Sequence, residues 1–183
     1  MSNRQTLKCH PDLRCDAVAR IEADVSRPKP SLLLLHYIVT GDIGALRLPP
    51  VAVPLRTDGL WQSTCFEAFV RASAAVAYYE FNFAPSMQWA AYRFDDYRSG
   101  MAPASEIDVP RIDVQSNSTG YELHVELELG RLSDLPANTS WHLGLSAVIE
   151  EKTGRKSYWA LAHPAGKPDF HHSDCFALEV PTA

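Results

Sequence analysis

Residues 59–71 read GLWQSTCFEAFVR, and residues 78–94 read YYEFNFAPSMQWAAYRF. Aromatic side chains are concentrated in these two stretches, and polar or charged residues recur between them with a fixed phase. Such alternation is typical of β-strands, in which successive side chains point to opposite faces. On the first stretch, Phe66 shares a face with Val70, whereas Glu67 lies on the other face. Most of these aromatics are therefore expected to fill a core, and Glu67, flanked by apolar neighbours, is either a pocket carboxylate or a paired buried charge.

The same patterning extends over nearly the whole chain and predicts an all-β protein. We expect 1–183 to form one domain, an antiparallel β-sandwich of the jelly-roll or immunoglobulin-like kind, with an irregular segment at 1–14. A short helical turn is expected at 129–135, ended by Pro136. The predicted strands span residues 17–25, 31–40, 43–48, 64–71, 78–83, 88–94, 108–116, 121–129, 141–150, 156–162 and 175–180.

The overall composition narrows the possible functions. The chain has 183 residues and a formal net charge of -5, which argues against nucleic-acid binding. No apolar run is long enough to span a bilayer, so we expect no membrane insertion. The N-terminus has no apolar segment of the kind found in secretory signals, and a cytoplasmic location is expected. The four cysteines are then not a disulfide framework. The oligomeric state is left open.

Two clusters contain residue types that can bind metals, but neither has a defensible pattern. Residues 9–15, CHPDLRC, match no zinc spacing. Residues 163–174, HPAGKPDFHHSD, form a loop with three histidines. His171 and His172 are adjacent and point to opposite sides of an extended chain, so they are not expected to share one ion. We therefore expect no metal site.

Trp61 and Glu67 form the most suggestive polar and aromatic pair. A carboxylate accepts hydrogen bonds from two neighbouring hydroxyl groups. An indole face can cover the apolar face of a sugar ring. The alternative is structural: Trp61 covers the edge of the core, and Glu67 pairs with an arginine such as Arg93. The spacing alone leaves both interpretations open.

The order of three motifs resembles a known family. Trp61 and Glu67 fit W-x(5)-E, residues 79–94 read YEFNFAPSMQWAAYRF, and residues 170–180 read FHHSDCFALEV. From about residue 15 onward the chain resembles the DOMON-like domains related to family 9 carbohydrate-binding modules. The resemblance implies a non-catalytic β-sandwich that binds a ligand in a cleft, with Trp61 stacking on a sugar and Glu67 accepting from its hydroxyl groups.

Family 9 modules close the sugar site with a second tryptophan late in the chain. This sequence has none after Trp159, and Phe170 or His171 would take that place. We thus expect a binding protein, not an enzyme, for a sugar-like small molecule, with no cofactor. Its expected ligand-binding residues are Trp61, Glu67, Asn82, Arg93, Phe170 and His171.

Besides a purely structural partner domain, which a wholly buried aromatic segment would favour, two alternatives remain open from the sequence. Other DOMON domains bind haem through a methionine and a histidine, and the available residues are Met87, Met101, His163 and His171. A glycoside hydrolase would need two facing carboxylates, for which Glu67 and Glu80 are candidates.

Overall fold

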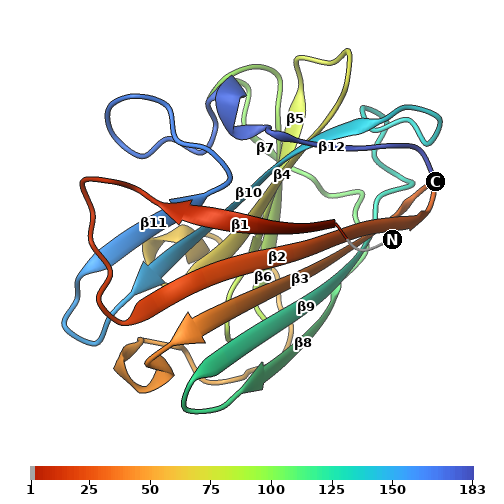
Figure 1. The fold of residues 1–183 in the computed structure, drawn as a ribbon. Helices are drawn as coiled ribbons and strands as arrows, with labels where there is room; N and C mark the ends of the chain where they lie inside the picture. The colour runs from red at the N-terminus through yellow and green to blue at the C-terminus, as the bar shows by residue number, and fades with distance from the viewer. Residues whose placement is uncertain (1–2) are drawn as a thin grey trace.

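A computed structural model describes residues 3–183 and shows an antiparallel, all-β protein (Figure 1). The predicted all-β class is therefore confirmed. The strands are β1 (Asn3–Cys9), β2 (Val18–Lys29), β3 (Leu32–Gly41), β4 (Cys65–Ala72), β5 (Tyr78–Phe83), β6 (Trp89–Phe94), β7 (Ala102–Pro103), β8 (Arg111–Ser116), β9 (Gly120–Glu128), β10 (Trp141–Glu150), β11 (Lys156–Ala160) and β12 (Leu178–Val180).

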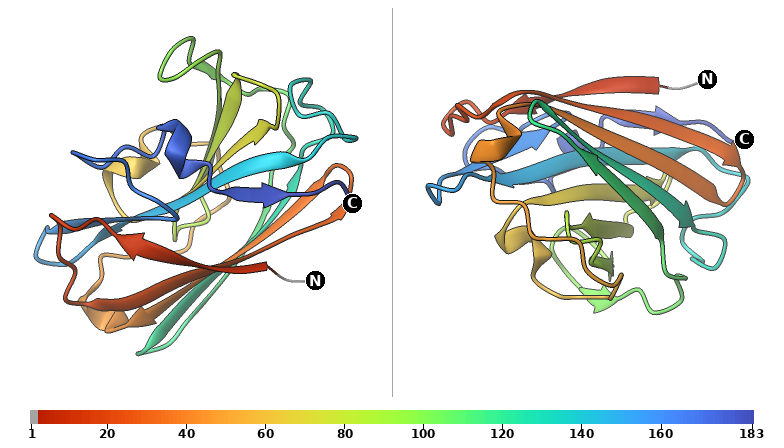
Figure 2. Two further views of the ribbon diagram at one scale, coloured as in Figure 1. Left: turned by 45° about the horizontal axis from the view of Figure 1, so that its top comes forward. Right: turned by 90° about the horizontal axis from the view of Figure 1, so that it is seen from below.

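The strands form one strongly curled sheet, in the order β7-β6-β5-β4-β10-β11-β1-β2-β3-β9-β8, and β12 pairs with β10. Figure 2 shows how the β2–β3–β9–β8 part folds over the β4–β5–β6–β10 part. The described residues also contain three 3-10 turns: η1 (Ile43–Ala45), η2 (Leu60–Gln62) and η3 (Ser173–Cys175). No helix among residues 3–183 is long and apolar enough to cross a membrane.

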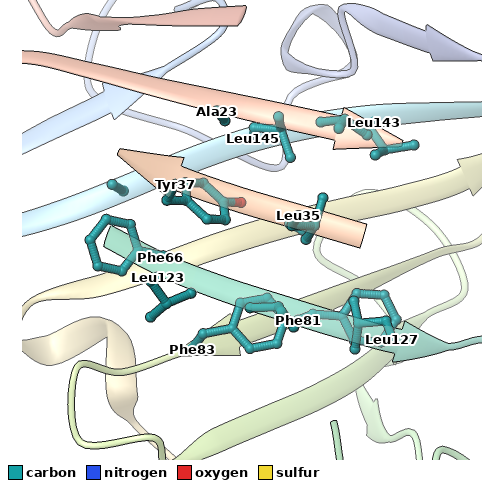
Figure 3. Close-up of a cluster of buried hydrophobic side chains, with 14 of the residues drawn as sticks. Ala23, Leu35, Tyr37, Phe66, Phe81, Phe83, Leu123, Leu127, Leu143 and Leu145 are labelled. Atoms are coloured by element: carbon teal, nitrogen blue, oxygen red, sulfur yellow. The ribbon is translucent and has the colours of Figure 1, made fainter. Parts of the chain in front are cut away.

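The main hydrophobic core fills the space between the two halves of the sheet. Figure 3 shows side chains of β3 and β9 lying over those of β4 and β5. The ring of Phe66 lies 5.2 Å from Tyr37 and stacks at 5.7 Å on Tyr121. The hydroxyl of Tyr37 donates a 2.7 Å hydrogen bond to the main-chain carbonyl of Glu67, so this buried polar group is satisfied. The alternation predicted for β4 is thus present, with Phe66 in the core and Glu67 on the other face.

The guanidinium group of Arg27 is buried at one end of this core. Its guanidinium carbon lies 3.4 Å from the centroid of the Trp141 ring, and the residue is 7% exposed. Its nitrogens donate to the carbonyls of Pro30, Ala137 and Thr139, at 2.6, 2.9 and 2.7 Å. These bonds replace the water that a buried guanidinium loses. The side chain therefore ties the β2–β3 turn to the segment before β10.

Three expectations about local structure need correction. Within the segment expected to be irregular, residues 3–9 form β1, which pairs with both β2 and β11; residues 1–2 lie outside the described part. Instead of the strand expected at 43–48, η1 forms because Ala45 and Leu46 donate to carbonyls three residues back, and Leu46 makes only an isolated bridge. The helical turn expected at 129–135 is a series of turns and bends.

Candidate ligand-binding site

A cavity of about 390 Å³ opens on the face of β4, β5 and β10 that points away from the main core. A second, smaller apolar cluster surrounds it, built around Phe69, Tyr78 and Phe94. The cavity therefore lies on the face that carries Glu67, the residue singled out by alternation. Its lining residues are Trp61, Glu67, Glu80, Phe94, Arg98, Met101, Val148, Tyr158, Pro168, Phe170 and His171.

Two nearly buried carboxyl groups form the floor of the cavity. Glu67 pairs with Asn82 across β4 and β5, and Phe69 pairs with Glu80, so the two glutamates are diagonal neighbours on one face. Glu67 is 3% and Glu80 6% exposed. The Ser146 hydroxyl donates to Glu67 at 3.3 Å, and the Asn82 amide donates to Glu80 at 2.8 Å. Among residues 3–183, no arginine forms an ion pair with Glu67, contrary to the structural alternative considered from the sequence.

The electrostatics of the floor favour a protonated acid. Burial raises the pKa of Glu67 well above its usual range, and the charge of Glu80 raises it further. Burial also raises the pKa of Glu80, although the hydrogen bond from Asn82 and the charge of Arg98 oppose this. A protonated carboxyl group can donate one hydrogen bond and still accept others. The floor can therefore present both donors and acceptors to a bound molecule.

His171 forms one wall, held by aromatic rings and a tyrosine hydroxyl. Its Nδ1 lies 2.7 Å from the hydroxyl of Tyr78, and its Nε2 lies 3.6 Å from Glu80. The imidazole meets the rings of Phe69 and Phe94 edge to face, each at 5.0 Å. Burial, with the nearby charge of Arg98, lowers the pKa of His171 to about 4. The wall is thus a neutral imidazole at neutral pH.

The loop that carries Phe170 and His171 is fastened at Asp169. This carboxylate accepts hydrogen bonds from the Tyr97 hydroxyl at 2.5 Å, from Arg98 at 2.7 Å and from the His171 main-chain nitrogen at 3.2 Å. These bonds lower the pKa of Asp169, although its partial burial acts in the opposite direction. The loop between β11 and η3 and the segment after β6 therefore meet at one ion pair beside the cavity.

Trp61 lies at the rim, on η2. It is 40% exposed, and its ring meets Tyr92 edge to face at 6.1 Å. The hydroxyl of Tyr92 in turn donates to Asp58 at 2.7 Å, just before the turn. An indole that is supported on its edge and open to solvent is available for a ligand to stack against.

The structure brings four of the six predicted residues together. Trp61, Glu67, Phe170 and His171 line the same cavity. Asn82 is fully buried beneath it and supports Glu80 through its amide. Arg93 is elsewhere: it pairs with Tyr79 across β5 and β6, on the opposite face from Glu67, and it binds Asp134 at 2.5 Å as well as Asp95.

Several lining residues are not anticipated from the sequence, among them Phe94, Tyr158, Val148 and Arg98. The sequence indicates Phe94 only as a core aromatic. It reaches the cavity because it lies on the same face of β6 as Tyr92. Tyr158 lies opposite Val148 on β11. Arg98 follows β6 in a loop where no periodicity applies, so no sequence signal could place it. The sequence offers Glu80 only as the second carboxylate of a hydrolase.

No protein-family model matches this chain, and no curated protein is detectably similar in sequence. Solved structures do share its fold. A protein of Bacteroides uniformis ATCC 8492, described as a candidate carbohydrate-binding protein, superposes with a TM-score of 0.69 at 14% identity, over 100% of this chain and 87% of that one. These values establish a common fold, and no more.

Family 9 carbohydrate-binding modules from Caldicellulosiruptor kristjanssonii are also similar. The module solved with cellotriose gives a TM-score of 0.60 at 12% identity, over 99% of this chain and 82% of that one. The module solved with glucose gives a TM-score of 0.51 at 13% identity, over 90% of this chain and 76% of that one. The fold of this chain is therefore similar to that of family 9 modules.

Proposed function

We propose that this protein is a non-catalytic binding protein for a carbohydrate or a sugar-like small molecule, held in the cavity between Trp61 and Glu67. One observation carries the proposal: a solvent-open indole and two buried carboxyl groups line the same cavity. Sugar recognition needs this combination, because a pyranose has an apolar C–H face and a rim of hydroxyl groups.

Each part of the cavity has a role in this proposal. Trp61 provides the stacking surface at the rim, and Phe170 with His171 forms the opposite wall. Glu67 and Glu80 bind hydroxyl groups from below, and Arg98 adds a cationic donor. Asn82 keeps Glu80 in position without touching the ligand. Arg93 has no part in binding, since it is committed to Asp134 and Asp95 on the other face.

The fold similarity supports the same ligand class. Structures that share this fold include family 9 modules in complex with cellotriose and with glucose. The resemblance in the motifs around Trp61, Glu67 and Phe170 points the same way and extends to the DOMON-like domains. In that scheme the two facing halves of the curled sheet correspond to the two layers of a β-sandwich.

The expected affinity is modest. At about 0.3 kcal/mol per non-hydrogen atom, a monosaccharide of about twelve such atoms gains ~3–4 kcal/mol, which corresponds to millimolar binding. A disaccharide that fills more of the cavity would reach about ten micromolar on the same scale. The ligand panel should therefore include di- and trisaccharides as well as single sugars.

Isothermal titration of the purified protein against such a panel tests the proposal. At least one sugar should bind, and Trp61→Ala should weaken its binding tenfold or more. Arg93→Ala, which removes a large side chain outside the cavity, should bind as the wild type does. A panel without any response would overturn the proposal. Glycoside turnover that disappears in Glu67→Gln, with folding intact, would replace binding by hydrolysis.

Haem remains the alternative ligand, because Met101 and His171 line the same cavity. The local geometry does not fit an axial ligand well, since His171 already has Tyr78 at Nδ1 and Glu80 near Nε2. An iron at Nε2 would have to displace Glu80. An absorbance scan of the protein after addition of haemin tests this directly: a Soret band lost in His171→Ala would favour haem.

A further inference from the structure

Two histidines lie side by side on the outer face of the other half of the sheet. His36 on β3 and His124 on β9 are direct cross-strand partners. Their rings stack with centroids 3.8 Å apart and an interplanar angle of 16°. Both side chains are partly exposed to solvent. The stacking keeps the two imidazoles next to each other on neighbouring strands, and a ring rotation would be needed for both to face one ion.

A carboxylate completes the group. Glu122 precedes His124 by two residues and therefore shares its face of β9. Its Oε2 lies 2.8 Å from Nε2 of His36 and 3.6 Å from Nε2 of His124. One ligand atom from each of the three residues falls within 4.8 Å of the others. Glu122 thus lies against both imidazoles at once.

The backbone that carries the group is anchored in the main core. The residues that flank His36 and His124 along their strands, Leu35, Tyr37, Leu123 and Val125, are at most 2% exposed. On the far side of His36, Asp24 of β2 lies directly opposite it, with Oδ2 3.8 Å from Nδ1. Asp24 is itself held by Arg4 at 2.6 Å. A carboxylate near the second nitrogen is the usual way in which a metal-binding histidine is oriented.

We propose that His36, Glu122 and His124 bind a divalent transition-metal ion of the zinc class. Two imidazoles and one carboxylate, with a fourth position left to water or another ligand, form a known donor set for Zn²⁺. Bond lengths of about 2.0–2.2 Å require ligand atoms closer together than 4.8 Å, and small χ rotations on an open face supply that approach. Magnesium and calcium prefer all-oxygen sites and should bind poorly.

This site is separate from the sugar cavity. It uses β3 and β9, whereas the cavity uses β4, β5, β10 and the segments around them. The main core lies between the two sets of strands. The inference therefore does not depend on the proposed function, and either can fail alone.

The test is a titration of untagged protein with Zn²⁺ at pH 7.5 in a non-chelating buffer. One ion per chain should bind, and His124→Ala or Glu122→Gln should weaken binding at least about tenfold, since second-shell partners alone are worth ~10–100-fold. Glu126→Gln removes a charge from the same face of β9, and His142→Ala removes a histidine on β10; both should bind Zn²⁺ normally.

Three results would overturn the inference: no uptake of Zn²⁺, equal binding of Mg²⁺, or unchanged affinity in both His124→Ala and Glu122→Gln. Circular dichroism without metal establishes that each variant is folded. Because Glu122→Gln keeps the size of the side chain, it preserves the test if His124→Ala loses structure.

Discussion

Glu80 lies diagonally across from Glu67 on the floor of the cavity, and its charge adds to burial in raising the pKa of Glu67 well above the ordinary value. Two carboxyl groups that share a site shielded from water cannot both ionise without a cost in free energy. Apolar side chains of similar size at such buried positions often give equal or greater folding stability. In the proposed function, a bound molecule adds hydrogen-bond partners to those that Ser146 and Asn82 already give the pair.

Replacing Glu67 by glutamine should raise stability in a pH-dependent way. An unfolded glutamate ionises near pH 4.3, while the native Glu67 keeps its proton to higher pH. The contribution of the protonated Glu67 to the free energy of unfolding is thus fully present below pH ~4.3 and is lost as the pH rises through the native pKa. The free energy of unfolding of Glu67→Gln should equal that of the wild type at low pH. At higher pH it should become larger than that of the wild type, by ~1.4 kcal/mol for each unit by which the native pKa is raised. Urea unfolding at several pH values measures the difference.

The comparison between variant and wild type removes the contributions that both proteins share and retains Glu67 together with its interaction with Glu80. The lowered pKa of His171, about 4, makes stability fall as the pH drops from about 6.5 toward 4, which is the opposite slope. That effect is present in both proteins and cancels in the difference. A difference in unfolding free energy that stays constant from pH 4 to 8 would contradict the assigned role of Glu67.

Asp169→Asn should weaken ligand binding without removing any lining side chain. Asparagine keeps the shape but loses the charge that holds Tyr97 and Arg98. We expect a loss of about 1–3 kcal/mol in stability and a several-fold weaker sugar affinity, because Phe170 and His171 lose their anchor. Thermal unfolding and titration with the best sugar of the panel give the two values.

The matched control for that change is Asp108→Asn. Asp108 forms an exposed ion pair with Arg131 at 2.8 Å, away from the cavity. Exposed pairs contribute at most about 1 kcal/mol, so this variant should alter neither quantity appreciably. Equal effects of the two substitutions on sugar affinity would show that the Asp169 contacts do not position the loop.

Arg27→Ala should destabilise the protein by about 2–4 kcal/mol. The change removes a cation over the Trp141 ring and leaves buried carbonyl groups without donors. Arg20→Ala, an exposed arginine on the same strand that pairs with Glu22, should cost less than about 0.5 kcal/mol. Chemical denaturation measures both. A cost for Arg27→Ala as small as that for Arg20→Ala would contradict this role.

Alternation along single strands predicted much of this molecule. It separated Phe66 from Glu67 correctly and identified most strands, because side-chain direction in a strand depends only on local sequence. The sequence analysis does not predict the strand at β1, since its polar residues give a weak pattern and, among residues 4–9, only Leu7 is buried. Its pairing depends on β2 and β11, which local sequence does not specify.

The site was harder to predict because it depends on register between strands. The sequence could place Arg93 on a strand, but only its pairing with Tyr79 shows that it lies on the face opposite Glu67. Arg98 has a left-handed backbone conformation in a loop, with φ of 51°, and no pattern marks such a residue as part of a cavity. His36 and His124 are far apart in sequence, and only the β3–β9 pairing makes them neighbours.

The double pairing of β1 also bears on how the chain folds. One part of this strand pairs with β2, which follows it directly, whereas Lys8 pairs with Ala160 near the other end of the chain. The sheet cannot be completed until nearly all the other strands exist. Contacts of such long sequence separation slow folding, because chain entropy is lost before they form. On a ribosome, β1 would emerge before β2 to β11 and would have to wait for β11, its last partner.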